Sequence, residues 1–323
     1  MQERTFGRLG WRIGEVGYGM WGMAGWTGSD DEESRASLQL ALDSGVTFFD
    51  TAWAYGEGKS EQLLGELVRA NPDRRIFTAT KIPPMNRQWP TRRGDALASA
   101  FPAAHIREYT ERSLVNLGLP AVDLIQFHVW EDAWAPDDDW QRAVDDLRRE
   151  GLVRGVGVSV NRWESWNVVD TLRTGLVDSV QTIYNVFEQV PEDALFPLCR
   201  ELGIAVIARV PLDEGSLTGT LTLESRWPEG DWRNGYFVPE NLAASVAHAE
   251  ALRPLVPAGS TMAEMALRFI LSNPDVSVVI PGMRSARHVA SNVAVSDAGP
   301  LPADILARLR AHRWDREPTR WSQ

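Results

Sequence analysis

The sequence predicts a (β/α)8 barrel, because short apolar runs alternate with longer helical patterns along all 323 residues. Eight such runs are rich in β-branched residues and mostly too short for helices, so we expect each to form a strand. Eight repeats in a chain of this length favour a closed barrel over an open doubly wound sheet. The expected strands cover residues 16–21, 46–50, 76–81, 122–128, 153–159, 178–184, 204–210 and 276–282.

Apolar residues at helical spacing fill the segments between these runs. Leu38, Ala41 and Leu42 lie at positions i, i+3 and i+4. The same spacing continues through 106–117 and stops at Gly118, where a helix C-cap is expected. We therefore expect helices on the outside of a parallel barrel.

Three segments add to the basic barrel. Residues 5–16 (TFGRLGWRIGEV) indicate a small hairpin across the bottom of the barrel. Residues 211–239 are long for a loop and rich in Gly, Trp and charge, which is typical of a functional loop. The acidic run 137–139 suits a helix start, because carboxylates are favoured at the positive end of the helix dipole. With no linker in sight, residues 1–323 are expected to form one domain.

The open doubly wound sheet competes with the barrel at one place. Gly17, Gly19 and Gly22 match the bare spacing of the dinucleotide-binding motif G-x-G-x-x-G in the first turn. That motif needs a helix directly after the turn, and no helical pattern follows here. We therefore continue to predict a barrel rather than an open doubly wound sheet.

Composition and charge limit the kinds of molecule that the protein is expected to bind. The chain has 33 Lys and Arg against 44 Asp and Glu, a net charge of −11, so it has no general attraction for nucleic acid or an anionic membrane. Cys199 is the only cysteine, which excludes an internal disulfide and favours the cytoplasm. The N-terminus lacks the apolar region of a signal peptide, and no run of about 18 apolar residues is present. A small-molecule partner is expected, and the oligomeric state is left open.

Polar residues gather where the strands end. In a (β/α)8 barrel the active site is built at the C-terminal ends of the strands. A charge at the end of an apolar strand is costly unless it is paired. The residues at these ends are Asp50, Lys81, His128, Ser159, Gln181, Arg209 and Gly282.

The first three of these ends suggest acid–base chemistry together with Tyr55, which follows Asp50 by five residues. A free Tyr has a pKa of about 10, and a nearby cation such as Lys81 is expected to lower it. Asp50 would hold that cation in place. The phenol could then act as a general acid, while His128 donates a hydrogen bond to a developing alkoxide.

These motifs resemble those of the aldo-keto reductase family. FFDTAWAYGEGKSEQLLGE resembles the segment that carries its Asp and Tyr, TK its Lys strand and DLIQFH its His strand, and the resemblance extends to IPGMRSARHVASN. It implies an NAD(P)H-dependent carbonyl reductase without a Rossmann fold and without a metal. Tyr55 would be the proton donor, Lys81 and Asp50 would tune it, and His128 would orient the carbonyl.

The same resemblance implies a cofactor site. The nicotinamide would lie near the ends of several strands, the pyrophosphate under 211–219, and the adenine with a 2′-phosphate at 282–292. Arg284 and Arg287 favour NADPH, with NADH as the alternative. Arg209 stands where many members carry an aromatic ring that stacks on the nicotinamide. The implied cofactor residues are Gly19, Met20, Trp21, Asp50, Ser159, Asn161, Gln181, Arg209, Pro211, Leu212, Ser216, Leu217, Gly219, Gly282, Arg284, His288 and Asn292.

Further aromatic residues are expected at the C-terminal ends of the strands, which form the mouth of the barrel. They suggest the wall of a substrate pocket suited to apolar or aromatic carbonyls, or to sugar faces. The expected lining is Trp21, Trp53, Tyr55, Trp89, His128, Trp130 and Trp227. Two alternatives stay open: an oxidative sugar or alcohol dehydrogenase on this fold, and a non-catalytic cofactor-sensing subunit, since some family members associate with channels. A barrel hydrolase fits poorly, because such chemistry uses paired carboxylates.

Overall fold

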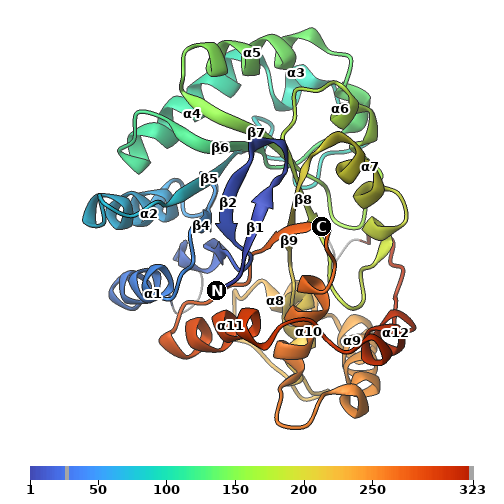
Figure 1. Cartoon of the computed structure of the whole chain (residues 1–323). Coiled ribbons are helices and arrows are strands. Elements are labelled where there is room, and N and C mark those ends of the chain that lie inside the picture. The colour runs from blue at the N-terminus through green and yellow to red at the C-terminus, as the bar shows by residue number, and fades with distance from the viewer. Residues whose placement is uncertain (26–28, 320–323) are drawn as a thin grey trace.

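Eight parallel strands in chain order form the wall of a barrel in the computed structural model, which describes residues 1–25 and 29–319 (Figure 1). Bridges Val16 to Val279 and Gly19 to Gly282 join the first strand to the last and close the wall. Each strand coincides with a predicted run, with only β5 extending one residue beyond it, so the barrel prediction is confirmed. The strands are β3 (Tyr18–Gly19), β4 (Phe48–Asp50), β5 (Phe77–Ile82), β6 (Val122–Phe127), β7 (Val153–Ser159), β8 (Ser179–Ile183), β9 (Ala205–Arg209) and β10 (Val276–Val279).

Helices surround this wall (Figure 1). They are α1 (Asp31–Asp43), α2 (Lys59–Ala70), α3 (Leu97–Ala100), α4 (Ala103–Leu117), α5 (Asp138–Arg149), α6 (Val169–Arg173), α7 (Leu195–Leu202), α8 (Arg233–Tyr236), α9 (Pro239–Leu252), α10 (Met262–Leu271), α11 (Ala286–Ala298) and α12 (Ala303–Arg310). Helix α4 ends at Gly118 in the left-handed conformation, as its spacing predicted. Helix α5 is N-capped by Asp137, whose carboxylate accepts from the Asp139 N–H. No helix in the described ranges is long and apolar enough to cross a bilayer.

Short 3₁₀ segments complete the chain: η1 (Gly7–Leu9), η2 (Trp21–Met23), η3 (Asp132–Trp134), η4 (Val190–Glu192), η5 (Asp213–Thr218) and η6 (Arg253–Leu255). The turn after β3 leads into η2 rather than into an α-helix. The glycine spacing in this turn therefore lacks the helix that a Rossmann phosphate site requires.

A hairpin of β1 (Glu3–Phe6) and β2 (Trp11–Gly14) lies across the N-terminal ends of the strands, as predicted (Figure 1). The Arg8 N–H donates to the Gly203 carbonyl just before β9 at 2.6 Å. Phe6 is fully buried, and its ring stacks between Trp11 and Phe48 with centroids 5.3 Å away on each side. The hairpin thus seals the bottom of the barrel with apolar side chains.

Alternation along each strand sorts the interior into layers. Residues two apart point to the same side, so one strand contributes both a lower and an upper inward side chain. The lower positions form an apolar cluster with the hairpin: Phe6, Ile13, Phe48, Phe77, Ala79, Leu124, Ala205, Ile207, Val278 and Ile280. Two residues further along the same strands come Asp50, Lys81, Gln126 and Arg209. The dry lower layer therefore forms the floor under a polar upper layer.

Phe6→Ala should lower the free energy of unfolding by about 3–5 kcal/mol, because it leaves a cavity between two packed rings. Urea unfolding monitored by circular dichroism at neutral pH measures this loss. Gln2→Ala, one residue before the hairpin, changes an exposed side chain and should stay within about 0.5 kcal/mol of wild type. Equal stability of the two variants would show that the hairpin does not stabilise the barrel.

Candidate active site

A buried ion pair occupies the centre of the polar layer. The ammonium of Lys81 is fully buried and donates to Asp50 Oδ1, and it also donates to the Thr51 carbonyl at 2.8 Å. The other oxygen of Asp50 accepts from the side-chain amides of Gln126 at 3.0 Å and Gln181 at 2.8 Å. Strands β4, β5, β6 and β8 thus all contribute to one network, which satisfies a charge that would otherwise be costly to bury.

Gln126 is a member of this network that the sequence analysis missed. Its amide lies between Asp50 and Gln181, whose Nε2 donates to Gln126 Oε1 at 3.2 Å. Gly157 on the neighbouring strand leaves room for it, since a Cβ there would lie 2.9 Å from Gln126 Cγ and closer still to Ser179 Oγ. The available signal was one amide inside the otherwise apolar stretch 124–127 before His128.

Tyr55 lies beside this pair on the turn that follows β4. Its hydroxyl is 3.4 Å from Lys81 Nζ, and its ring stands edge-on to His128 with centroids 5.6 Å apart. The turn is tight, because the Gly58 N–H donates back to the Trp53 carbonyl at 2.7 Å and Gly58 has a φ of 95° that favours glycine. The four predicted catalytic residues, Asp50, Tyr55, Lys81 and His128, therefore lie together.

Burial sets the protonation states of these groups. It raises the pKa of Tyr55, and the opposing effect of Lys81 is smaller, so the expectation of a lowered pKa is wrong in direction. Burial acts to lower the pKa of Lys81, but Asp50 and Tyr55 together raise it. Burial, then Lys81 and Arg209, hold the pKa of His128 well below its usual value. At neutral pH the site holds a protonated phenol, a charged ammonium and a neutral imidazole.

Two polar atoms at the mouth have no hydrogen-bond partner among the described residues. One is Nδ1 of His128, and the other is Nε of Arg209, both buried. Arg209 donates instead through Nη2 to the Val160 carbonyl at 2.8 Å. Burial and the nearby Arg162 lower the pKa of Arg209 to about 10. Buried donors and acceptors of this kind are satisfied when a polar ligand enters.

The expected nicotinamide positions divide into two groups. Ser159 lies in register opposite Gln181, so their adjacent strands bring them to one side of the mouth. The side-chain amide of Asn161 makes hydrogen bonds within the protein, since its Nδ2 donates to Thr91 Oγ1 at 3.1 Å and to the Trp130 carbonyl at 3.0 Å. Its Oδ1 is the only part of that amide left without a described partner.

Residues near the first strand are placed by close backbone approach. A Cβ at Gly19 would lie 2.6 Å from the Ile280 carbonyl, so glycine is required where the barrel closes. Met20 is buried and its N–H donates to the Asp50 carbonyl at 2.9 Å, whereas Trp21 is 41% exposed. Arg284 lies against Gly22, which connects the expected adenine segment to this end of the barrel.

The remaining expected cofactor positions follow two strand ends. In the loop after β9, Pro211, Ser216 and Leu217 are buried, while Leu212 and Gly219 are partly exposed. After β10, Gly282, Arg284 and His288 are exposed, and Asn292 is buried and donates to the Gly282 carbonyl at 3.4 Å. Both segments leave the same C-terminal ends of the barrel as the catalytic residues.

The expected aromatic pocket is only partly at the surface. Trp89 is 40% exposed, and its ring meets His128 edge-on at 4.5 Å. Trp53 contacts Tyr109, and Trp227 stacks on Phe237 within the long loop. The prediction that Trp130 lines the substrate pocket is wrong, because its ring is fully buried and its Nε1 donates to Thr171 Oγ1. The ring packs in an aromatic cluster with Phe101, Phe127, Trp134 and Trp140.

Comparison with known proteins agrees with this geometry. Residues 15–313 match the model of the Aldo/keto reductase family. The chain belongs to this family. Members are NAD(P)H-dependent oxidoreductases, so the chain is an oxidoreductase with a nicotinamide cofactor, and the resemblance inferred from the sequence is confirmed.

Three individual similarities extend over nearly the whole chain. The NADH-specific methylglyoxal reductase of Escherichia coli (strain K12) is 27% identical over 98% of this chain and 100% of its own length. A probable voltage-gated potassium channel subunit beta of Oryza sativa subsp. japonica is 29% identical, with 96% of each covered. The structure of a glycerol dehydrogenase from Gluconobacter oxydans has a TM-score of 0.78 and 25% identity, covering 96% of this chain and 94% of that one.

Lys81→Met should lower the free energy of unfolding by about 3–5 kcal/mol, because it leaves the Asp50 carboxylate buried without its counter-ion. Chemical unfolding at neutral pH measures the loss. The double variant Asp50→Asn with Lys81→Met removes both charges and should recover most of it.

Lys59→Met is the matched control for this test. Lys59 pairs with Asp31 at the surface, where the two side chains are 41% and 40% exposed. Loss of such a pair should cost less than about 1 kcal/mol. An equally small effect of Lys81→Met would mean that the Asp50 carboxylate is not left as an uncompensated buried charge.

Proposed function

We propose that the protein reduces an aldehyde or ketone to an alcohol, with NADPH as the hydride donor and Tyr55 as the general acid. The observation that supports this most directly is the Tyr55 hydroxyl, 3.4 Å from a buried lysine and next to a neutral imidazole. The bound cofactor supplies the hydride. All other steps fall to residues of the chain, which we take to be a single barrel domain.

Each side chain has a defined part in the proton transfer. Tyr55 keeps its proton at neutral pH, so it can release it to the carbonyl oxygen as negative charge develops there. The phenolate left behind is stabilised by Lys81, whose charge is held in place by Asp50. His128, being neutral, can donate one ring N–H to the same oxygen and orient it. The amides of Gln126 and Gln181 fix Asp50.

The chain's own residues fit a nicotinamide dinucleotide. The unpartnered Nε of Arg209 lies at the mouth, and its planar guanidinium is suited to stack on a ring. Arg284 and Arg287 are exposed, and Arg284 lies against Gly22 near the end of the first strand. The two arginines would bind a 2′-phosphate, which is our reason to favour NADPH. NADH is the alternative, and the Escherichia coli relative is named for it.

Two relatives correspond to the competing activities. One is named a glycerol dehydrogenase, and another a probable voltage-gated potassium channel subunit beta. A steady-state assay separates these possibilities from ours. Purified protein is mixed with NADPH or NADH and a panel of carbonyls that begins with 4-nitrobenzaldehyde, and loss of the reduced cofactor is followed by absorbance. In parallel runs it is mixed with NADP+ or NAD+ and a panel of alcohols, and gain of the reduced cofactor is followed. Turnover with alcohols alone would favour the dehydrogenase, and cofactor binding without any turnover would favour the sensing subunit.

Tyr55→Phe should lower kcat by about 10²–10⁴, the range for loss of a general acid. Binding of NADPH, measured by quenching of tryptophan fluorescence, should change little. Tyr109→Phe is the matched control, since that ring contacts Trp53 and, among the described residues, its hydroxyl makes no hydrogen bond to Asp50 or Lys81. Full turnover by the Tyr55 variant would contradict its role.

Trp89→Ala should raise KM for an aromatic aldehyde about tenfold with little change in kcat, because the ring lies beside His128 and is exposed to a bound substrate. Trp166→Ala serves as the control, as that ring is 49% exposed but lies against Arg93 instead. The measurement is a substrate titration at saturating NADPH. Unchanged KM in the Trp89 variant would remove this ring from the substrate pocket.

A further inference from the structure

The loop after β9 has a strained backbone. Val210, Asp213 and Glu214 have φ values of 51°, 46° and 57°, in a region that residues with a Cβ occupy at a cost. They are three of the six non-glycine residues with positive φ in the described ranges. A fourth is Trp163, whose ring contacts Arg316 of the C-terminal tail. Such a conformation persists only where surrounding contacts hold it.

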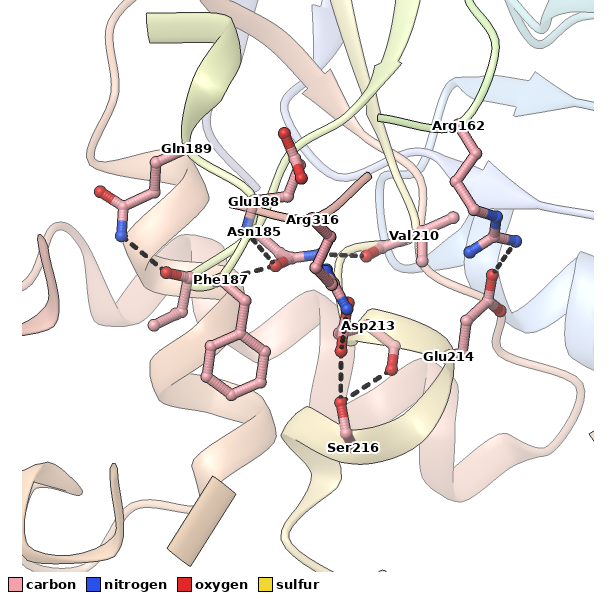
Figure 2. Close-up of polar contacts among 11 residues, drawn as sticks. Arg162, Asn185, Phe187, Glu188, Gln189, Val210, Asp213, Glu214, Ser216 and Arg316 are labelled. Carbon is pink, nitrogen blue, oxygen red and sulfur yellow. Dashed lines mark hydrogen bonds and ion pairs between the residues drawn. The ribbon is translucent and has the colours of Figure 1, made fainter. Parts of the chain in front are cut away.

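Two arginines from distant segments hold the carboxylates of this loop (Figure 2). Arg316 donates to both oxygens of Asp213, at 2.7 and 3.2 Å, and the two side chains are only 4% and 3% exposed. Arg162, which follows β7, donates to Glu214 at 2.7 Å. Ser216 donates its hydroxyl to Asp213 as well. A dry, bidentate pair of this kind fixes geometry more strictly than a surface ion pair does.

Arg316 is oriented independently of the loop. Its guanidinium lies 4.6 Å from the ring of Trp163 and 4.6 Å from that of Trp314. The Trp314 ring stacks on His248 at 4.1 Å, and its backbone N–H donates to the Phe187 carbonyl at 2.9 Å. The C-terminal tail is therefore held by contacts outside the loop, and these contacts place the Arg316 guanidinium next to Asp213.

The guanidinium also has a second carboxyl group within its electrostatic reach. Glu188 is buried, and its Oε2 has no hydrogen-bond partner among the described residues. Burial raises the pKa of Glu188 to about 7, and Arg316 acts in the opposite direction. Nε of Arg316 is likewise unpartnered within the described ranges. When Asp213 is released, Arg316 is thus not left as an isolated buried charge.

Charge gives this arrangement a consequence for ligand binding. The loop carries two carboxylates at the mouth, and unpaired carboxylates there would repel a diphosphate. Arg316 and Arg162 neutralise one each. The ion pairs therefore both hold the loop's shape and remove its repulsion of an anion.

We propose that Arg316 is a positioning residue that clasps loop 210–219 in its strained form, and that opening of the Arg316–Asp213 pair controls release of the bound dinucleotide. This inference rests on the proposed function, since that function makes the loop part of the cofactor site. Arg316 acts through Asp213 and is not itself assigned to the chemistry.

Hydrogen–deuterium exchange tests the clasp without any cofactor. Arg316→Gln should raise exchange of the amides in 213–219 by about tenfold or more, since the pair that holds this backbone is lost. Arg316→Lys keeps the charge but loses the bidentate geometry, so its exchange rate in this loop should lie between those of wild type and Arg316→Gln. Arg313→Gln is the matched control, because that tail arginine makes a bidentate pair with Asp193 instead. Equal loop exchange in Arg316→Gln and wild type would overturn the clasp.

Stopped-flow fluorescence then measures dissociation of NADPH. Arg316→Gln and Asp213→Asn should each release it about tenfold faster or more, and the double variant no faster than either, because the two residues act as one pair. KM for the carbonyl should stay at the wild-type value, and melting curves check that each variant is folded. Additive effects, or equal acceleration by Arg313→Gln, would overturn control of release by this pair.

The two failures are distinguishable. A wild-type protein that binds neither NADPH nor NADH would overturn the proposed function, and with it the part of the inference that concerns release. The exchange experiment decides the clasp in either case, because it uses the protein alone.

Discussion

The site depends on one buried ion pair, Lys81 with Asp50. Neither charge reaches solvent, so each must find its partners inside the protein. The Thr51 carbonyl and the amides of Gln126 and Gln181 complete the set. These partners come from four strands, and they meet only if the barrel is closed and every strand is in register. A charged pair of this kind is an argument for specificity of the active geometry more than for overall stability.

The same burial gives the neighbouring groups their protonation states. Burial disfavours the phenolate of Tyr55 and the imidazolium of His128, so both stay neutral. Lys81 keeps its charge, because Asp50 lies against it. A neutral acid beside a fixed cation is suited to protonate an oxyanion, since the cation interacts favourably only with the phenolate left after transfer. The apolar floor made with the hairpin is therefore part of the site's chemistry.

Periodicity and strand-end polarity were enough to predict the strands, the hairpin and the four central residues. These features are local, and alternation alone decides which residue reaches the mouth. Other features depend on packing that no local pattern encodes. Trp130 turned inward into an aromatic cluster, and burial of Tyr55 outweighed the cation that was expected to lower its pKa. Gln126 was harder to predict than the strand-end residues, because its inward position follows only once the strand register is known.

The clasp lies furthest from what the sequence could predict. Arg162, Asp213 and Arg316 are separated by 51 and 103 residues, taking the differences of their numbers, and none stands in a recognisable pattern. A chain with a net charge of −11 must still accept an anionic cofactor, so local neutralisation matters more than the total. Here each carboxylate at the start of the loop is matched by an arginine from another segment. Since a buried bidentate pair is lost as a unit, the shape of the loop and the cancellation of its charge should be lost together.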